Sequence, residues 1–550
     1  GPCKERRVPE LSPEYCIDIM SRNRLFILSS FSGCLLSLPW LGILPGWILF
    51  IALVPLLIAE DHLTRQKEKY ADIVFWGLVY LCFLLWNSLS TWWIMHATIT
   101  GAILVASLNA AFMATVWWIF HLMKRRFRLL GNLSLIVFWI SFEYLHYNWE
   151  IQWPWLTLGN GFANQVNLVQ WYEYTGVLGG SLWILTTNLL FLQLYKKITA
   201  APSGRPEGIL MLILIVILIP SLFSVCDYNS YEEKGKPCEI IILQPNIDPY
   251  SEKFDGMSKL AQVDVLTHLT DSLLTNSTDY VIGPETALPP VWETNDMHNH
   301  RYLAPFRERT RSHPRLKFVL GATTQVRYPS GEKMPATVRL NTIDSTWYDA
   351  YNTALQIDSS GNVQIYHKSI LVTGVEKMPF SRYFSFLEKY IVDLGGITGS
   401  LGSQEEPSNF TSGDSIQTAP VICYESVFGE YITEYIRKGA ELIFIITNDG
   451  WWKNTPGYKQ HLSFARLRAI ETRRDIARSA NTGISAFINQ RGDILQQTKW
   501  WTRTALHGTI QTNDSLTFYV RYGDYIGRIC SFIAVLLLLY YLSQIYIKHR

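Results

Sequence analysis

The sequence contains little charge. Asp, Glu, Lys and Arg make up 17% of its 550 residues, against about 25% in an average globular domain. The net charge is only +2 at pH 7, so no strong basic field is available to attract a nucleic acid. We therefore expect no nucleic-acid partner, and the low charge suits a protein in apolar surroundings.

Signatures of metals and cofactors are also missing. The eight cysteines form no CxxC pair and no cysteine–histidine zinc spacing, so we expect neither a metal site nor another cofactor. The sequence also contains no glycine-rich loop that could cradle a phosphate. Cys226 and Cys238 could pair in an oxidising compartment or stay free thiols.

Long apolar stretches, by contrast, are abundant. Eight of them approach the length of about 20 residues that crosses a bilayer as a helix, and they are Leu25–Trp40, Leu41–Ala59, Ile73–Met95, Ile99–Met123, Leu130–Leu145, Gly176–Tyr195, Ile209–Val225 and Tyr525–Ile547. Pro39, Pro45 and Pro55 interrupt the first two stretches. Eight buried helices of this kind are unusual in a soluble protein, so we predict an α-helical membrane bundle of eight spans.

Basic residues set the expected orientation of the bundle. Clusters of Lys and Arg stand before the first stretch, after the second, fourth and sixth, and at the end of the chain. With eight spans every cluster falls on one side, which the positive-inside rule makes the cytoplasm. The expected division is a cytoplasmic segment at 1–24, seven spans at 25–225, an outer domain at 226–523, and an eighth span with a short cytoplasmic tail at 524–550.

Two polar features belong to the membrane region. Glu143 lies inside the fifth stretch, where a carboxylate is costly and serves either structural pairing or function. The loop that follows contains Trp149, Trp153 and Trp155. Such tryptophans suit anchoring at the lipid–water interface, or a lip over a path by which lipid enters.

The outer block has the pattern of a soluble α/β domain. Seven short apolar segments are predicted to be buried strands, namely Ile240–Gln244, Tyr280–Glu285, Phe318–Ala322, Thr353–Asp358, Pro420–Glu425, Leu442–Asp449 and Ile484–Gln490. Of these, only 353–358 and 484–490 stand beside hairpin signals and are expected to be antiparallel. His461–Ala480 is predicted to be a helix. This alternation indicates a layered α/β domain, in which ligands gather at the carboxyl ends of strands.

Three residue types at these strand ends fit acyl transfer. Glu285 and Cys423 each end a predicted strand, and Lys368 follows a hairpin. A lysine favours the reactive thiolate and can stabilise an oxyanion, and a carboxylate can take a proton and return it. Taken singly, each residue has an ordinary structural alternative: a helix cap, a solvated charge and a core thiol.

Longer motifs carry a resemblance. The segments GPETALPP, YHKSILVTGVEKMPF and ICYESVFGE, followed by ITNDGWW, resemble the signatures of the nitrilase (carbon–nitrogen hydrolase) superfamily. With the apolar stretches on both sides, and with the outer loop WPWLTLGNGFANQVNLVQWYEYTGVLGG, the chain is similar to the apolipoprotein N-acyltransferase family. The resemblance implies a nitrilase-like αββα sandwich outside the membrane, on an eight-helix bundle.

The resemblance also implies a reaction and its setting. An acyl chain passes from a phospholipid, typically phosphatidylethanolamine, to a cysteine thioester, and then to the N-terminal amine of a diacylglyceryl-cysteine apolipoprotein, in ping-pong order. The implied setting is the bacterial inner membrane, with the catalytic domain in the periplasm and both termini in the cytoplasm. The chain is expected to work as a monomer.

The family's functional residues fall on particular positions of this sequence. Glu285 matches the general base and acid, Lys368 the oxyanion stabiliser and Cys423 the nucleophile. The matching supporting residues are Glu376, Tyr424 and Glu425. The segment VTGVE, which ends at Glu376, departs from the family's usual Val-Pro-Phe-Gly-Glu, so the loop that carries this glutamate is expected to differ in shape.

Other candidate residues surround this set. Asn352 precedes a predicted strand and either supports the site or occupies a turn. Phe254 is the best match to a tryptophan of the family. Apolar loop residues are expected either to line a substrate path or to pack internally, and they are Trp451, Trp452, Met378, Pro379 and Phe380.

Two other functions compete with acyl transfer to an amine. A membrane-tethered amidase of the nitrilase superfamily could use the same three residues and release an acid to water. A receptor or scaffold could use the fold only to bind a ligand. The apolar stretches disfavour the first alternative, because a soluble amide needs no membrane bundle, and the complete residue set disfavours the second.

Overall fold

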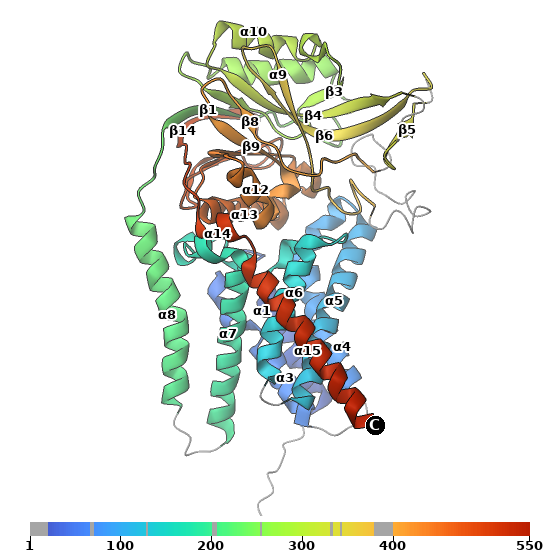
Figure 1. Ribbon diagram of the computed structural model, residues 1–550, viewed down its shortest axis with the longest axis vertical. Coiled ribbons are helices and arrows are strands. Elements are labelled where there is room, and N and C mark those ends of the chain that lie inside the picture. The colour runs from blue at the N-terminus through green and yellow to red at the C-terminus, as the bar shows by residue number, and fades with distance from the viewer. Residues whose placement is uncertain are drawn as a thin grey trace, which may run out of the picture.

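The computed structural model describes residues 20–65, 71–127, 130–200, 206–253, 256–329, 334–341, 344–378 and 400–549. Helices from both ends of the chain form an upright bundle, and the segment between them forms an α/β domain that sits on one end of it (Figure 1). The chain leaves the bundle through α8 (Glu207–Ser230) and returns through α15 (Tyr525–His549). The α/β domain is therefore an insertion between the last two helices of the bundle.

The bundle is built from the apolar stretches of the sequence. Its other helices are α1 (Arg22–Ser37), α2 (Leu49–Ala52), α3 (Val54–Arg65), α4 (Ala71–Thr91), α5 (Ile99–Arg126), α6 (Gly131–Asn148) and α7 (Tyr172–Ala200). Prolines shorten the first two expected spans: α1 ends before Pro39, and helical structure resumes only after Pro45. A proline has no amide hydrogen and clashes with the preceding turn, which explains both boundaries.

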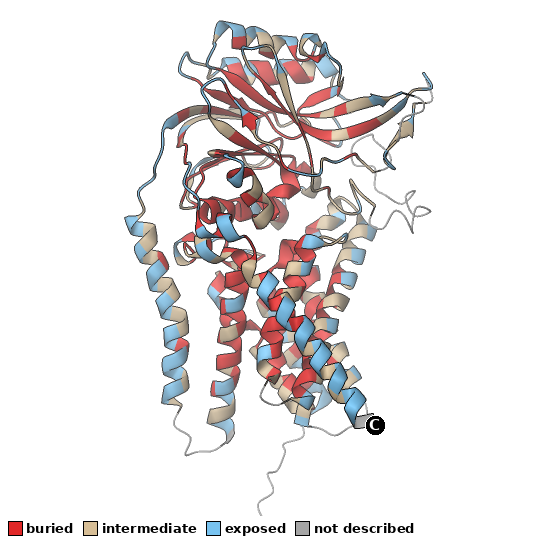
Figure 2. Ribbon diagram, viewed as in Figure 1, coloured by how far each residue is buried: buried red, intermediate tan, exposed pale blue. Residues whose placement is uncertain are grey.

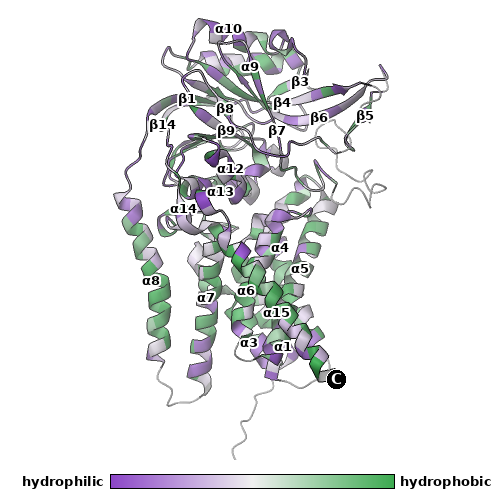
Figure 3. Cartoon of the chain, viewed as in Figure 1, coloured by the Kyte–Doolittle hydropathy of each residue, from purple (hydrophilic) through white to green (hydrophobic). Residues whose placement is uncertain are grey.

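Six described segments are long and apolar enough to cross a membrane, and they are Gly46–Arg65, Ala71–His96, Ile99–Arg126, Tyr172–Thr199, Glu207–Ser230 and Tyr525–Ile547. The helices α1, with 16 residues, and α6, with 18, do not belong to this group. The count of eight spans therefore stays a prediction. The surfaces of α8 and α15 are largely exposed and apolar (Figures 2 and 3), which suits contact with lipid.

The α/β domain consists of two facing sheets with helices on both outer faces. The larger sheet has eight strands in the order β14-β1-β2-β4-β6-β5, with β3 beside β4 and β7 beside β6. The smaller has six, in the order β13-β12-β11-β10-β9-β8. The strands of the larger sheet are β1 (Pro237–Gln244), β2 (Tyr280–Ile282), β3 (Leu288–Trp292), β4 (Lys317–Tyr328), β5 (Arg339–Leu340), β6 (Trp347–Ile357), β7 (Val363–His367) and β14 (Thr504–Gln511).

The strands of the smaller sheet are β8 (Phe410–Thr411), β9 (Gln417–Ile422), β10 (Leu442–Thr447), β11 (Ile476–Ala480), β12 (Ala486–Ile488) and β13 (Ile494–Gln497). The helices of the domain are α9 (Lys259–Asp271), α10 (Ala304–Ser312), α12 (Gly429–Arg437), α13 (Pro456–Thr472) and α14 (Phe518–Tyr522). The pair α9 and α10 covers the larger sheet, and α12 and α13 cover the smaller one. The result is a four-layer αββα sandwich whose α12–α13 layer faces the bundle (Figure 1).

All seven predicted strands have a counterpart, in β1, β2, β4, β6, β9, β10 and β12. Two expectations were wrong. The predicted helix at 461–480 ends at Thr472, because Arg473 adopts a left-handed φ of 50° and the chain then forms β11. Antiparallel pairing also joins β1 to β14 and β8 to β9. The strand β14, with the sequence TALHGTIQ, lacks the continuous apolar run by which a buried strand is recognised.

The helix α13 joins the two parts of the molecule. The buried Gln460 accepts hydrogen bonds from the indole N–H groups of Trp93, at 3.2 Å, and Trp155, at 2.7 Å. Its own amide donates to the carbonyl oxygens of Trp40, at 2.7 Å, and Ser90, at 3.0 Å. One side chain of the α/β domain thus satisfies four polar groups of the bundle, which holds the domain in a fixed place above it.

The tryptophans of the outer loop lie at this junction. Trp155 is buried and packs on Trp93, Trp452 and Phe464, and Trp153 stacks on Trp155. The expected anchoring of Trp155 at the lipid interface is therefore wrong. The hydrogen bond to Gln460 on α13 holds the Trp155 ring in the interface between the bundle and the α/β domain, called the seam below.

Buried carboxylates within the bundle are held by partners. Glu143 accepts hydrogen bonds from the Trp139 indole at 2.9 Å and from the Leu158 amide at 2.8 Å. Glu60, at the other end of the bundle, contacts Lys124 and the ring of His121. For Glu143 the contacts are those of structural pairing, in which the carboxylate fixes the start of the outer loop.

We predict that Gln460→Leu weakens the attachment of the domain. The leucine keeps the side-chain size but removes the partner of the Trp155 indole and of the Trp40 carbonyl, each at a cost of about 1–3 kcal/mol, whereas the Trp93 indole keeps its second acceptor, the Ser90 carbonyl, at 3.2 Å. Thermal unfolding of the purified protein in detergent is expected to shift to lower temperature by several degrees. The matched control is Gln497→Leu on the exposed end of β13, and an equal shift in both variants would contradict the role of Gln460.

Candidate active site

The candidate nucleophile stands at a strained turn. Cys423 follows the last residue of β9 and begins a short 3-10 helix, Cys423–Val427. It adopts a φ of 51°, in the left-handed region that residues with a side chain seldom enter. Strain of this kind persists only where the surroundings enforce it. This left-handed backbone conformation turns the Cys423 side chain out of the strand direction, at the carboxyl edge of the sheet.

Glu285 lies beside this edge, three residues beyond β2. It is buried, with 8% of its surface exposed. One carboxylate oxygen accepts hydrogen bonds from the Asn352 amide, at 2.8 Å, and from the Lys368 ammonium, at 3.4 Å. The other accepts from the backbone N–H of Asn448 at 3.1 Å. Donors from three separate segments therefore fix the position of the Glu285 carboxylate.

Lys368 is buried between two carboxylates. It follows β7 directly, and its ammonium lies 2.9 Å from an oxygen of Glu376 and 3.4 Å from Glu285. Burial lowers the pKa of Lys368, but Glu376 and Glu285, with Cys423, outweigh burial and raise the pKa above its ordinary value. The lysine is therefore a permanent cation in the site.

Asn352 connects the two carboxylates. Its side-chain amide donates to Glu285 and, at 2.9 Å, to Glu376, and its backbone carbonyl accepts from the Lys368 backbone N–H at 2.8 Å. The residue lies within β6, so it does not occupy a turn. Glu376 is held in turn by the Val372 amide at 2.8 Å. The unusual VTGVE segment thus folds into a tight turn, with Gly374 at a φ of 82°, that returns its glutamate to Lys368.

The surroundings of Cys423 favour the protonated thiol over the thiolate. Burial raises the pKa of Cys423, Glu285 raises it further, and Lys368 lowers it without cancelling the other two effects. The ionised groups that act on Cys423 are the Lys368 ammonium and the Glu285 and Asp449 carboxylates, so a thiolate here would add a third negative charge. The arrangement can generate a thiolate only if Glu285 accepts the proton that leaves the sulfur.

Glu425 ties the nucleophile turn to the lysine loop. Its two oxygens accept hydrogen bonds from the backbone N–H groups of Ser369 (2.8 Å), Ile370 (3.2 Å) and Ile422 (2.8 Å), and from the Tyr366 hydroxyl (2.6 Å). Burial raises the pKa of Glu425 to about 7. Its neighbour Tyr424 points the other way and donates to the Gln152 carbonyl of the outer loop at 3.1 Å.

A second buried network under Cys423 was not predicted from the sequence. The ring of His461, on α13, lies 3.1 Å from the Cys423 carbonyl oxygen and 2.9 Å from the Ser426 hydroxyl. Its other nitrogen contacts Asp449 at 3.0 Å, and Asp449 also accepts from Arg478 at 2.7 Å. Burial alone raises the pKa of Asp449, but Arg478 and His461 outweigh it and hold the pKa well below its ordinary value.

The network of His461, Asp449 and Arg478 holds the backbone carbonyl of Cys423, the residue with the left-handed φ. The ring of His461 meets the carbonyl of the same residue whose φ is 51°. The sequence offered only a partial signal for it: Asp449 was expected at a strand end, but His461 and Arg478 belong to a predicted helix and gave no motif. Their roles become visible only when α13 packs under β9 and β11.

The expected substrate-lining residues have mixed placements. Phe254, Pro379 and Phe380 lie outside the described residues. Trp452 packs on Trp93 and Trp155 in the seam, which favours the packing alternative. Trp451 accepts a hydrogen bond from Tyr250 through its carbonyl oxygen at 2.9 Å, and the two rings touch edge to face. Met378 is half-buried, at the end of the VTGVE turn.

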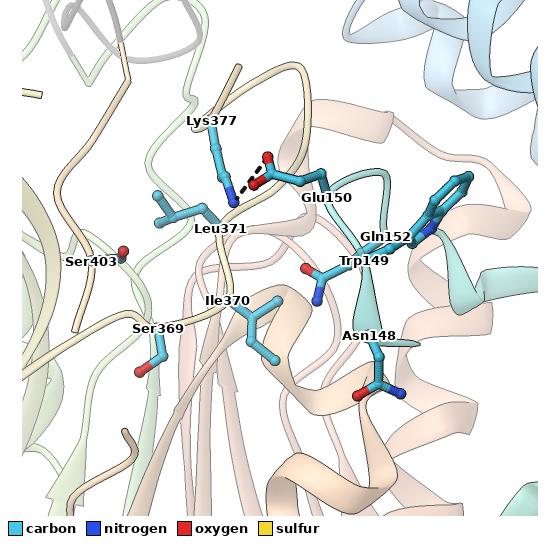
Figure 4. A pocket seen from close by; sticks show the side chains of 9 residues that line it. All are labelled: Asn148, Trp149, Glu150, Gln152, Ser369, Ile370, Leu371, Lys377 and Ser403. Carbon is cyan, nitrogen blue, oxygen red and sulfur yellow. Dashed lines mark ion pairs between the residues drawn. The ribbon is translucent and has the colours of Figure 1, made fainter. Parts of the chain in front are cut away.

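Two pockets lie between the outer loop of the bundle and the α/β domain. One, of about 300 Å³, is shown in Figure 4 and is crossed by an ion pair of Lys377 with Glu150, at 3.6 Å. Its walls are Asn148, Trp149, Glu150, Gln152, Ser369, Ile370, Leu371, Lys377 and Ser403. The other, of about 450 Å³, shares Asn148, Gln152 and Ile370 with it. Both pockets therefore border the segment that directly follows Lys368.

Other candidate groups can be placed as well. Cys226 is exposed and Cys238 is buried in β1, and both are free thiols. Among the described residues, no group of three or more His, Cys, Asp or Glu side chains is placed to hold a metal ion.

Comparison with known proteins places the chain in a family. Residues 32–190 match the apolipoprotein N-acyltransferase N-terminal domain, and residues 243–516 match the carbon–nitrogen hydrolase family. An apolipoprotein N-acyltransferase of Chlorobaculum tepidum is 31% identical over 94% of this chain and 96% of its own length. The chain belongs to the apolipoprotein N-acyltransferase family. The resemblance inferred from the sequence motifs is confirmed.

More distant relatives extend the comparison. An apolipoprotein N-acyltransferase of Geobacter metallireducens is 26% identical over 92% of this chain and 93% of its own. Among solved structures, Saccharomyces cerevisiae Nit3, of the nitrilase superfamily, covers 50% of this chain and 90% of its own at 14% identity, with a TM-score of 0.36.

The charges around Cys423 predict opposite effects of two substitutions. Glu285→Gln removes a negative charge and should lower the thiol pKa, so that iodoacetamide alkylates Cys423 faster at pH 8. Lys368→Met removes the positive charge and should slow alkylation. Each change is expected to reach about tenfold, the equivalent of one pKa unit. Peptide mass mapping measures the rate at Cys423 alone.

Lys377→Met provides the control for these variants. This lysine lies in the same loop but is half-exposed and paired with Glu150, so its loss should leave the alkylation rate unchanged. Rates that move in the same direction in Glu285→Gln and Lys368→Met would show that access, and not charge, governs the thiol.

Proposed function

We propose that this chain transfers an acyl chain from a phospholipid, typically phosphatidylethanolamine, to the N-terminal amine of a diacylglyceryl-cysteine apolipoprotein. Family membership supports the class of reaction. The observation that carries the proposal is the burial of Glu285 and Lys368 together beside Cys423, at the face of the α/β domain that meets the membrane bundle. This set is complete for acyl transfer through a thioester.

In the first half-reaction, Glu285 takes the proton from the Cys423 sulfur as the sulfur attacks the ester carbonyl of the phospholipid. The carbonyl oxygen becomes an oxyanion, which Lys368 stabilises. When the intermediate collapses, the bond to the glycerol oxygen breaks, and Glu285 returns its proton to that oxygen. Lysophospholipid leaves, and the acyl chain stays on Cys423 as a thioester.

In the second half-reaction, the neutral amine of the acceptor attacks the thioester carbonyl. Glu285 takes a proton from the attacking nitrogen, and Lys368 again stabilises the oxyanion. Collapse of the intermediate breaks the carbon–sulfur bond, and the proton on Glu285 returns to the departing thiolate. The products are an amide on the acceptor and the free Cys423 thiol, as at the start.

Supporting residues keep the cation in position through both halves. Glu376 and Asn352 hold Lys368, and Glu425 holds the loop after it. Moving the proton from Cys423 to Glu285 leaves the total charge of the site unchanged. A buried site tolerates such a transfer because no net charge is created in a medium of low polarity.

A site next to the membrane suits substrates that carry acyl chains. Lifting a chain out of lipid costs about 0.8 kcal/mol for each CH₂. We propose the arrangement expected from the sequence: eight spans, both termini in the cytoplasm, the domain at 226–523 in the periplasm of a bacterial inner membrane, and a monomeric enzyme. It is supported by Arg65, Arg125 and Arg126, which lie at helix ends remote from the α/β domain.

The acyl-enzyme can be tested directly. Incubation of the detergent-purified protein with phosphatidylethanolamine is expected to add one acyl group to its intact mass, in a form labile to hydroxylamine. The adduct should be absent from Cys423→Ala, because the other described cysteines lie outside the site. Addition of a diacylated lipopeptide should discharge the adduct and produce an N-acylated peptide.

Other outcomes point to the competing functions. Discharge to water alone, with free fatty acid released and the lipopeptide unmodified, would support the amidase. If neither an adduct nor lysophospholipid forms, the result would contradict a catalytic role for Cys423. The receptor or scaffold would then be the remaining function.

The network under Cys423 yields a separate prediction. His461→Phe should keep the packing of α13 but lose support for the Cys423 carbonyl, so thioester formation should slow about tenfold or more while the concentration of donor at half-maximal rate stays the same. His507→Phe, on β14, is the matched control. A fall in thermal stability that accounts for the whole loss of rate would reduce His461 to a packing residue.

A further inference from the structure

The larger pocket opens where the α/β domain meets two helices of the bundle. It is lined by Tyr144, Tyr147, Asn148, Gln152, Ile370, Phe428, Glu430, Tyr431, Glu434 and Arg528. Tyr144 lies in the last turn of α6, and Arg528 lies in the first turn of α15. Both positions are where the helices leave the apolar part of the bundle, which is the level of lipid headgroups.

The pocket carries both signs of charge. Arg528 donates to Glu430 at 2.6 Å and also to the Tyr522 carbonyl. Because a guanidinium has five N–H groups, Arg528 retains donors for a further anion. Glu434 lies one helical turn beyond Glu430, and within the part of the chain that the structure describes its carboxylate has no hydrogen bond or ion pair. The lining side chains comprise two carboxylates and one guanidinium, a net charge of −1. Outside the lining, the cations Arg437 and Lys438 lie near Glu434 and partly balance it.

The inner wall of the pocket touches the catalytic turn. The ring of Phe428 packs edge to face on Tyr424, the residue after the nucleophile, with centroids 5.1 Å apart. The Tyr431 hydroxyl lies 2.7 Å from that of Tyr366, which donates to Glu425. Ile370 is one of the residues whose amide binds Glu425. The pocket therefore borders the residues that hold the turn carrying Cys423, while Cys423 itself is not among its lining residues.

We propose that this pocket selects the headgroup of the acyl donor. The donor headgroup is zwitterionic with a terminal ammonium: its phosphate binds Arg528, and its ammonium binds Glu434. The inference rests on the proposed function and names residues that determine its donor specificity.

The geometry and the charge of the pocket favour this ligand class. Glu430 and Glu434 lie four residues apart on α12, and side chains at that spacing stand about 6 Å from each other. Arg528 is paired with Glu430, so Arg528 and Glu434 can bind the two ends of one short headgroup. A headgroup that carries only a phosphate would place its charge in a pocket that is already negative. Such a lipid has no ammonium to pair with Glu434, and its phosphate and the Glu434 carboxylate would repel each other within the pocket.

The test compares two donors in the first half-reaction. Thioester formation on Cys423 is followed by intact mass, with phosphatidylethanolamine or phosphatidylglycerol in the same detergent micelles. Wild type is expected to be charged faster by phosphatidylethanolamine. In Glu434→Gln, which changes one charge and little volume, this preference should fall about fivefold, the size expected for loss of a half-exposed ion pair.

Glu308→Gln is the matched control, because Glu308 is an exposed carboxylate of the same domain on α10, which covers the larger sheet on the side away from the bundle (Figure 1). It should leave the donor preference at the wild-type value. Arg528→Gln should slow charging by both donors to a similar degree, since both contain phosphate. Its thermal unfolding is measured in parallel, and Glu434→Gln decides the question if Arg528→Gln does not fold.

Three results would overturn the proposal. An unchanged donor preference in Glu434→Gln would remove Glu434 from headgroup selection. Normal charging followed by slow discharge to a diacylated lipopeptide would show that the pocket takes the ammonium of the acceptor instead. A preference that falls equally in Glu308→Gln would reduce the effect to the overall charge of the domain. Failure of the proposed function itself is distinct, because wild type would then form no thioester with either donor.

Discussion

The burial of one ammonium group constrains the whole site. Lys368 is 1% exposed, and a lone charge at that depth is strongly unfavourable. Glu285 and Glu376 balance it from two sides, and Asn352 holds both carboxylates at the required separation. These contacts exist only if the end of β2, the middle of β6 and the turn after β7 meet at one point. The charge balance therefore ties the larger sheet to Cys423, at the end of β9 in the smaller one.

The same region is also the junction with the membrane bundle. The layer of α12 and α13 covers the smaller sheet on one side and meets the bundle on the other. His461 reaches up from α13 to the nucleophile turn, and its neighbour Gln460 reaches the tryptophans of the bundle. One helix thus contacts both the turn that carries Cys423 and the tryptophans of the bundle, so the distance between them is fixed by the rigidity of a single element.

Much of the site could be predicted from the sequence, because its parts obey local rules. Buried strands are short apolar runs, and Glu285 and Cys423 were found at their ends, where ligands gather in α/β folds. The motif around Lys368 led to Glu376 eight residues later, although the loop between them was expected to differ in shape. Two things escaped prediction. His461 gave no signal in a helix without a metal or catalytic motif, and β14 lacks an apolar run although it pairs along the whole length of β1.

The sequence by itself determined the apolar helices, and it supplied the expected orientation and the three candidate reactive groups, because each of these depends on composition or on neighbours along the chain. The tertiary structure alone decided that Trp155 turns away from lipid to meet Gln460, that Asn352 bridges two glutamates, and that Glu434 and Arg528 share a pocket. These contacts join residues far apart in sequence, such as Trp155 and Gln460 or Glu430 and Arg528. Their energies depend on burial and on distance in space, and neither quantity exists until the sheets have packed on each other and on the bundle.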